Sequence, residues 1–220
     1  FFLLFPVVLS LHCLVAGQEA GAKKDECVIL LHGLGRSSRS MVKLEKNLSE
    51  QGYRVLNVNY LSSKHPIEYL ADVLLDSVIQ EWSNKAGSKL HFVTHSMGGI
   101  VVRYYLKQHT LPNLGRVVML SPPNQGSELV DQLKGNFIFD NSGGPAARQL
   151  GTDKNSFVLN LGPVDFELGV IAGSRSMNPF YSSILPGPDD GVVSVERTKV
   201  EGMADFLVLP YSHRSIIKKK

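Results

Sequence analysis

Apolar residues along this chain follow two alternating patterns, short runs or alternations typical of strands and stripes with helical spacing. The strand-like segments are rich in Val, Ile and Leu, and they cover residues 27–33, 53–60, 89–95, 115–123, 167–174 and 205–213. Helical spacing predicts amphipathic helices between them, over residues 41–52, 66–87 and 97–110. Strands that alternate with helices pair in parallel through right-handed crossovers. We therefore expect an α/β fold with a doubly wound, mostly parallel sheet of about six strands and helices on both faces.

The helix predicted over residues 66–87 shows the clearest stripe of the three. Pro66 suits a helix start because proline lacks the backbone N–H that would go unbonded there, and Gly87 suits a helix end. The apolar stripe predicted to face the sheet comprises Ile67, Leu70, Leu74, Val78 and Trp82.

The first 16 residues, FFLLFPVVLSLHCLVA, carry no charge and are too short for a typical spanning helix of about 20 residues. Small residues follow at the end of this run, which is typical of a signal peptide. We interpret residues 1–17 as a signal peptide or membrane anchor, with an ordinary buried strand as the weaker alternative. The expected location is then secreted or periplasmic, or at a membrane through this segment. Residues 18–220 form a single predicted domain.

Composition excludes several classes of protein. The chain has 220 residues with a net charge of +3, which the three lysines at residues 218–220 account for, so the body offers no basic footprint for nucleic acid. Two cysteines do not form a disulfide scaffold, and they do not reveal the redox compartment.

A candidate nucleophile follows the third predicted strand. Thr94-His95-Ser96-Met97-Gly98-Gly99 passes from that strand straight into a helix. A serine in such a strand–turn–helix junction sits in a strained turn with its hydroxyl exposed. Gly98 would relieve crowding against neighbouring backbone, and the helix N-terminus would offer free N–H groups to a developing oxyanion.

A serine nucleophile needs a base, and His213 is the best placed of the seven histidines. It follows the last predicted strand, at the sheet edge where reactive groups gather in such folds. The other six lie in the leader, within strands, at a helix end, before a proline or beside tight turns: His12, His32, His65, His91, His95 and His109. His32 and His95 are expected to brace the turns that they adjoin.

A carboxylate must orient the base, and the segment over residues 187–195 supplies Asp189 and Asp190 in a Gly/Pro-rich loop. The alternative is that these aspartates only shape a turn. The segment over residues 32–35, HGLG, follows the first strand. Its backbone could turn the Leu34 N–H toward a substrate carbonyl, so that Leu34 and Met97 together form an oxyanion hole.

The motifs HGLG, THSMGG, DDGVV and SHRS, in this order, resemble the α/β-hydrolase superfamily over residues 27–213. The chain is most similar to small bacterial lipases and esterases and to their inositol-deacylase-like relatives. One departure is Thr94, which stands where the common G-x-S-x-G pentapeptide has its first glycine.

The resemblance implies hydrolysis of carboxylic esters through an acyl-serine intermediate, with no metal and no organic cofactor. It implies that Ser96, Asp190 and His213 are catalytic, because Asp190 occupies the aspartate of the D-G-x-V arrangement found in related lipases. The expected partner is a small-molecule or lipid ester, and we expect a monomer that binds no nucleic acid.

Other functions are less consistent with the residues. HGLGRSS lacks the third glycine of a dinucleotide fingerprint, and no acidic residue ends the second strand. A zinc site from His91 and His95 would need two side chains about 13 Å apart along a strand to converge. A non-catalytic hydrolase-fold module, or a thioesterase, acyltransferase or amidase with the same triad, stays open.

The connection over residues 124–166 is punctuated by glycine and proline and holds only brief apolar patches. It predicts a short cap of one or two helices rather than a large amphipathic lid. We therefore expect short or medium acyl esters to be preferred over long-chain triglycerides.

Overall fold

The computed structural model describes residues 26–83 and 89–218. The predicted signal or anchor segment, residues 1–17, and the predicted helix end at Gly87 lie outside the described residues. No helix among the described residues combines the length and the apolar character needed to cross a membrane.

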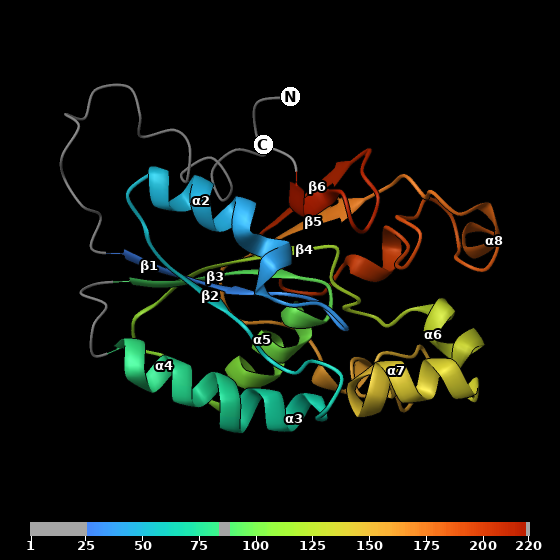
Figure 1. Ribbon diagram of the computed structural model, residues 1–220, viewed down its shortest axis with the longest axis horizontal. Coiled ribbons are helices and arrows are strands. Elements are labelled where there is room, and N and C mark those ends of the chain that lie inside the picture. The colour runs from blue at the N-terminus through green and yellow to red at the C-terminus, as the bar shows by residue number, and fades with distance from the viewer. Residues whose placement is uncertain (1–25, 84–88, 219–220) are drawn as a thin grey trace.

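Six parallel strands form one twisted sheet (Figure 1). Their spatial order is β2-β1-β3-β4-β5-β6, and every neighbouring pair is parallel. The strands are β1 (Glu26–Leu31), β2 (Arg54–Val58), β3 (Lys89–His95), β4 (Leu114–Leu120), β5 (Leu168–Gly173) and β6 (Asp205–Leu209). The doubly wound α/β sheet expected from the alternating pattern is confirmed.

Helices cover both faces of this sheet (Figure 1). Helix α2 (Val42–Glu50) lies on one face, preceded by a 3-10 turn over Ser38–Met41. Helix α5 (Met97–Gln108) lies on the other face beside a long helical segment that begins at Ile67. Each face has its own buried apolar cluster, which includes Ile29 and Phe92 on the α5 side and Val28 and Leu30 on the α2 side. The alternation of neighbouring residues in β1 between the two clusters follows from the two-residue period of a strand.

The segment that starts at Ile67 is one helix in the expected place, but its buried stripe differs from the predicted one. It consists of α3 (Ile67–Tyr69), a π-helical turn (Leu70–Leu75) and α4 (Asp76–Ser83). A π-turn contains more residues than an α-turn, so it rotates the rest of the helix about the helix axis. Leu75 and Ile79 are therefore fully buried, whereas the predicted Leu74, Val78 and Trp82 are only partly buried.

Most strands end earlier than the apolar pattern predicts, and the difference is largest in β4 and β6. β4 ends at Leu120, just before Ser121 and the pair Pro122-Pro123, and β6 ends at Leu209, just before Pro210. Proline has no N–H to donate to a neighbouring strand, so the ladder stops at these positions. The short ends leave loops, rather than strands, at the edge where the candidate residues lie.

The connection between β4 and β5 forms two main helices beyond the carboxyl ends of the strands (Figure 1). These are α6 (Glu128–Leu133) and α7 (Phe137–Arg148), and α7 is kinked at Gly144, where the backbone has φ 66°. A 3-10 turn over Leu159–Leu161 follows, and a further short helix, α8 (Pro179–Ser182), lies after β5. The connection thus holds more helical structure than the one or two short helices expected, because α7 is two helical pieces joined at the Gly144 kink.

Arg103 on α5 ties both ends of the cap to the sheet. Its buried guanidinium donates to the Asn124 carbonyl oxygen at 2.7 Å and to the Gly162 carbonyl oxygen. Burial lowers the pKa of Arg103 to about 10, and these carbonyl dipoles face the charge. Asn124 also donates from Nδ2 to the Thr198 carbonyl oxygen at 2.9 Å, so the start of the cap is fixed from two sides.

Candidate active site

Ser96 occupies the sharp turn between β3 and α5. Its backbone has φ 54° and ψ −128°, a conformation that is strained for a residue with a side chain. The turn needs Gly98, because a Cβ there would lie 2.7 Å from the Leu31 carbonyl oxygen and 2.8 Å from the His32 carbonyl oxygen. The predicted role of Gly98 in relieving backbone crowding is thus confirmed, and the tight fit fixes the Ser96 hydroxyl at the end of the sheet.

The structure brings Ser96, His213 and Asp190 into one hydrogen-bonded chain. His213 Nδ1 donates to Asp190 Oδ2 at 2.7 Å, and the Ser96 hydroxyl donates to His213 Nε2 at 3.0 Å. This tautomer follows from the carboxylate, which can only accept. All three residues are buried. Residues from three distant parts of the sequence therefore meet in the order required to activate a serine.

The loop that carries both aspartates separates their roles by geometry. The second oxygen of Asp190 accepts from the backbone N–H groups of Val192 and Val193, at 3.0 and 2.8 Å. Asp189 faces elsewhere: its carboxylate accepts from the Ser182 hydroxyl and, at 2.7 Å, from the Gly191 N–H. Asp190 contacts His213, whereas Asp189 closes the turn.

Ser121, at the end of β4, is a member of this network that sequence reasoning missed. Its hydroxyl is fully buried and hydrogen-bonds the Asp190 carboxylate, and its backbone has φ 47°. Burial alone would raise the pKa of Asp190, but the His213 charge and the hydrogen bonds from His213, Val193 and Ser121 together lower it. A positive φ at a serine directly after a strand is visible only in the structure, since no motif marks it.

His95 and His32 support the site from behind, as the sequence predicted. The His95 ring donates from Nε2 to the His213 carbonyl oxygen at 2.7 Å, and the two rings lie 4.8 Å apart. Burial, followed by the charge of His213, lowers the pKa of His95 to about 3, so the ring is neutral at ordinary pH. The His32 ring stacks on Tyr60 and donates from Nδ1 to the Gly33 carbonyl oxygen at 2.9 Å.

The loop after β1 has the geometry of a tight turn around Leu34. The Arg36 N–H donates to the Gly33 carbonyl oxygen at 3.2 Å, and the Gly35 N–H donates to the Ser62 hydroxyl at 3.0 Å. Within the described residues, neither the Leu34 nor the Met97 N–H has a hydrogen-bond acceptor in the protein. Both N–H groups are thus free for a ligand oxygen, which is the condition that an oxyanion hole requires.

A cavity of about 340 Å³ opens onto Ser96 and His213. Its wall is mostly apolar and comes from the cap, the loop after Asp190 and the loops after β1 and β4. The apolar residues are Leu34, Pro123, Leu129, Val130, Leu133, Phe139, Leu150, Val192 and Val193. That volume is near the lower end of the range for small-molecule sites, and its apolar wall suits a hydrocarbon group.

Thr94, the departure from the common pentapeptide, fits without distorting the turn. Its side chain is fully buried, and its Oγ1 lies 3.2 Å from where a Cβ on Gly99 would be. Gly99, next to Gly98, leaves the room that a threonine needs. The hydroxyl has no hydrogen-bond partner among the described residues, so the fit costs some stability.

The described residues contain no group of three or more His, Cys, Asp or Glu side chains that could hold a metal ion. His91 accepts from the Arg116 N–H at 2.9 Å through Nδ1, whereas His95, four residues farther along β3, donates to the His213 carbonyl oxygen. The two histidines do not converge.

The sequence matches a family model described as "Putative serine esterase (DUF676)" over residues 21–124. That range contains Ser96 and the loop over residues 32–35, whereas Asp190 and His213 lie beyond it. No curated protein matches the chain significantly.

Solved structures of lipases and esterases are similar to the chain over most of its length. The mature form of lipase BlEst2 from Bacillus licheniformis has a TM-score of 0.70 at 20% identity, covering 91% of this chain and 89% of that one. A metagenomic carboxyl esterase has a TM-score of 0.64 at 17% identity, covering 93% and 74%. The chain has the α/β-hydrolase fold.

Phospholipase PlaB from Legionella pneumophila shares this α/β-hydrolase fold, with a TM-score of 0.63 at 21% identity over 79% of this chain and 45% of that one. Together, the family match and these neighbours support a lipase- or esterase-like hydrolase.

The buried His95 predicts a specific pH dependence of stability. The unfolded chain binds a proton at His95 below its ordinary pKa of 6.5, whereas the folded protein does not do so until about pH 3. The unfolded state thus binds more protons in that window, and the free energy of unfolding falls as the pH drops from 6.5 toward 3, by at most about 1.4 kcal/mol per pH unit for this one group.

We expect His95→Gln to remove the contribution of His95 to this pH dependence. The free energy of unfolding of the variant should then fall less steeply with decreasing pH than that of the wild type. Urea titrations at several pH values measure the slopes. His65→Gln, which removes a half-buried ring stacked on Tyr69 away from the site, is the control. Parallel curves for His95→Gln and wild type would contradict the account.

Proposed function

We propose that the protein is a serine esterase that cleaves carboxylic esters through an acyl-serine intermediate. One observation carries the proposal: the hydrogen-bonded chain from Asp190 through His213 to Ser96 ends at the floor of an apolar cavity. The hydrogen bond between the histidine and the serine hydroxyl does little to stabilise the strained turn. The same alignment of a base on a hydroxyl is what acyl transfer needs.

Ser96 Oγ attacks the ester carbonyl while His213 Nε2 takes its proton. The Asp190 carboxylate stabilises the resulting imidazolium and keeps Nδ1 protonated, so that Nε2 always faces the serine. The negative charge that develops on the carbonyl oxygen is met by the Leu34 and Met97 N–H groups. Met97 is the first residue of α5, so the positive end of the helix dipole adds to this stabilisation.

Collapse of the tetrahedral intermediate breaks the bond to the alcohol, which leaves with the proton held on His213. The acyl group then sits on Ser96 with its hydrocarbon portion against the cap residues. A water oxygen then attacks the acyl carbon while His213 takes a proton from that water. The bond from the acyl carbon to Ser96 Oγ breaks, His213 returns the proton to Oγ, and the carboxylic acid leaves. The His95 ring donates from Nε2 to the His213 carbonyl oxygen, and this hydrogen bond keeps His213 in position through both half-reactions.

Ser96→Ala tests the nucleophile. Turnover of p-nitrophenyl butyrate should fall by about 10³-fold or more, as losses of a triad member commonly do. Ser183→Ala, an exposed serine on the loop after α8, is the matched control and should keep wild-type rates. Near-normal hydrolysis by a folded Ser96→Ala protein would end the serine-esterase proposal.

The two adjacent aspartates give a second test. Asp190→Asn should lower kcat by about 10³-fold, because an amide can donate to Nδ1 and so stabilise the wrong tautomer of His213. Asp189→Asn should change kcat by less than about tenfold, since Asp189 only closes the turn next to the site. Steady-state kinetics of both variants decide the point, and a larger loss in Asp189→Asn would reverse the assignment.

The size of the cavity limits the acyl chain. The cap consists of one six-residue helix and one kinked helix, and neither forms a long amphipathic lid that could cover an extended chain. Each methylene that fits the cavity contributes up to about 0.8 kcal/mol, whereas methylenes beyond its edge stay in water and contribute little.

We therefore expect kcat/KM for p-nitrophenyl esters to rise from acetate to a maximum at short or medium chains and then to fall. No jump in rate should occur when the substrate passes from solution to emulsion. Highest efficiency at palmitate, together with activation at an oil surface, would contradict this expected limit on chain length while leaving the triad intact.

A further inference from the structure

Two arginines line the cavity, one next to the Leu34 turn and one next to His213. Arg36 follows the Leu34 turn by two residues, and Arg214 directly follows His213. Apart from His213, they are the only ionisable side chains among the described residues that line this cavity. The apolar lining thus comes mainly from the cap, whereas the two cationic side chains come from the loops after β1 and β6.

Neither arginine is neutralised by the protein. Within the described residues, no carboxylate forms an ion pair with Arg36 or Arg214, and both side chains are exposed. The two guanidinium groups are close enough that the charge of Arg214 adds to desolvation in lowering the pKa of Arg36. Two like charges held together at a substrate mouth lower the stability of the free protein, unless an anion sits between them.

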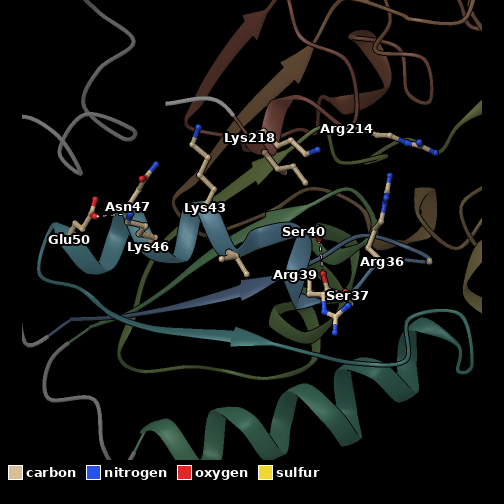
Figure 2. Close-up of a pocket in the computed structure, with 13 residues that line it drawn as sticks. Arg36, Ser37, Arg39, Ser40, Lys43, Lys46, Asn47, Glu50, Arg214 and Lys218 are labelled. Atoms are coloured by element: carbon tan, nitrogen blue, oxygen red, sulfur yellow. Dashed lines mark hydrogen bonds and ion pairs between the residues drawn. The ribbon is translucent and has the colours of Figure 1, made fainter.

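The same two arginines also border a larger surface groove of about 1270 Å³ (Figure 2). Arg36 and Arg214 lie at one end of this groove, and Lys46 and Glu50 lie at the other. It is lined by six cationic side chains and one carboxylate; the cations are Arg36, Arg39, Lys43, Lys46, Arg214 and Lys218. Glu50 lies 3.7 Å from Lys46, so the arginine end of the groove keeps its positive charge.

We propose that Arg36 and Arg214 bind a phosphate group on the alcohol portion of the ester substrate, while the acyl chain occupies the apolar cap side. This inference rests on the proposed function and narrows its substrate class to acyl esters of phosphate-bearing alcohols. In that pose the alcohol oxygen lies beside His213, which must protonate it as it leaves, and the phosphate reaches the adjacent Arg214.

A phosphate suits this pair better than a single carboxylate does. A guanidinium donates two parallel hydrogen bonds to neighbouring oxygens of an oxyanion, and two guanidiniums together need more acceptor oxygens than one carboxylate offers. The wide cationic field of the groove would also draw an anionic substrate toward the mouth.

The test compares two soluble esters that differ only in the phosphate, 1-hexanoylglycerol 3-phosphate and 1-hexanoylglycerol, both below the concentration at which they aggregate. We expect wild-type kcat/KM to be about tenfold or more higher for the phosphate ester, mainly through KM, because charge-assisted hydrogen bonds act on binding. Arg36→Gln and Arg214→Gln should each lower the ratio of the two efficiencies by about fivefold, and the ratio controls for partial misfolding. Arg148→Gln, at an exposed arginine of α7 that lines neither the cavity nor the groove, should leave the ratio at its wild-type value.

A ratio near one in the wild type, or a ratio that both glutamine variants leave intact, would overturn the inference. A ratio near one in solution combined with arginine-dependent activity on vesicles of anionic lipid would also overturn it, and would identify the groove as a membrane-docking surface instead.

Binding separates failure of this inference from failure of the proposed function. Calorimetric titration of glycerol 3-phosphate into the Ser96→Ala protein needs no catalysis, and the affinity should fall when Arg36→Gln or Arg214→Gln is added. Arginine-dependent binding without ester hydrolysis by the wild type would refute the esterase and keep the phosphate site. Hydrolysis of the neutral ester without arginine-dependent phosphate binding would keep the esterase and refute the phosphate site.

Discussion

All six strands of the sheet run in the same direction, and the site depends on that constraint. Parallel strands deliver their carboxyl ends to one edge, so the loops after β1, β3, β4, β5 and β6 meet there. The Leu34 turn, Ser96, Ser121, the Asp190 loop and His213 come from those loops. The strained turn at Ser96 persists because the surrounding sheet and Gly98 leave the backbone no relaxed alternative.

Further hydrogen bonds to Asp190 and His213 hold the residues that meet at this edge in a fixed geometry. Asp190 is held on one oxygen by two backbone N–H groups, which leaves the other oxygen for His213. His95 fixes the backbone of His213 and stays neutral because it is buried, so it adds no charge that would compete with the proposed base. The cap is anchored separately, through the buried Arg103, and its apolar residues can therefore form one wall of the cavity without constraining Ser96, His213 and Asp190.

The fold class could be predicted from the sequence, and so could Ser96 and His213, because each lies beyond an apolar strand. Position alone left Asp189 and Asp190 both possible, and only the resemblance to related lipases favoured Asp190. Local pattern could not predict contacts that depend on distant packing. Leu75 and Ile79 replace Leu74 and Val78 in the buried stripe because of a π-turn, which leaves no signature in hydrophobic spacing. Ser121 contacts Asp190 from a backbone conformation with positive φ that no sequence motif marks. The pairing of Arg36 with Arg214 joins residues from opposite ends of the described chain.

Covalent labelling of the nucleophile tests the central claim most directly. A fluorophosphonate forms a stable bond only with a serine that a neighbouring base activates, so digestion and mass spectrometry of the treated wild-type protein identify that serine by position. The account predicts one adduct, on the peptide that contains Ser96. An unlabelled protein, or an adduct on any other serine, would contradict it.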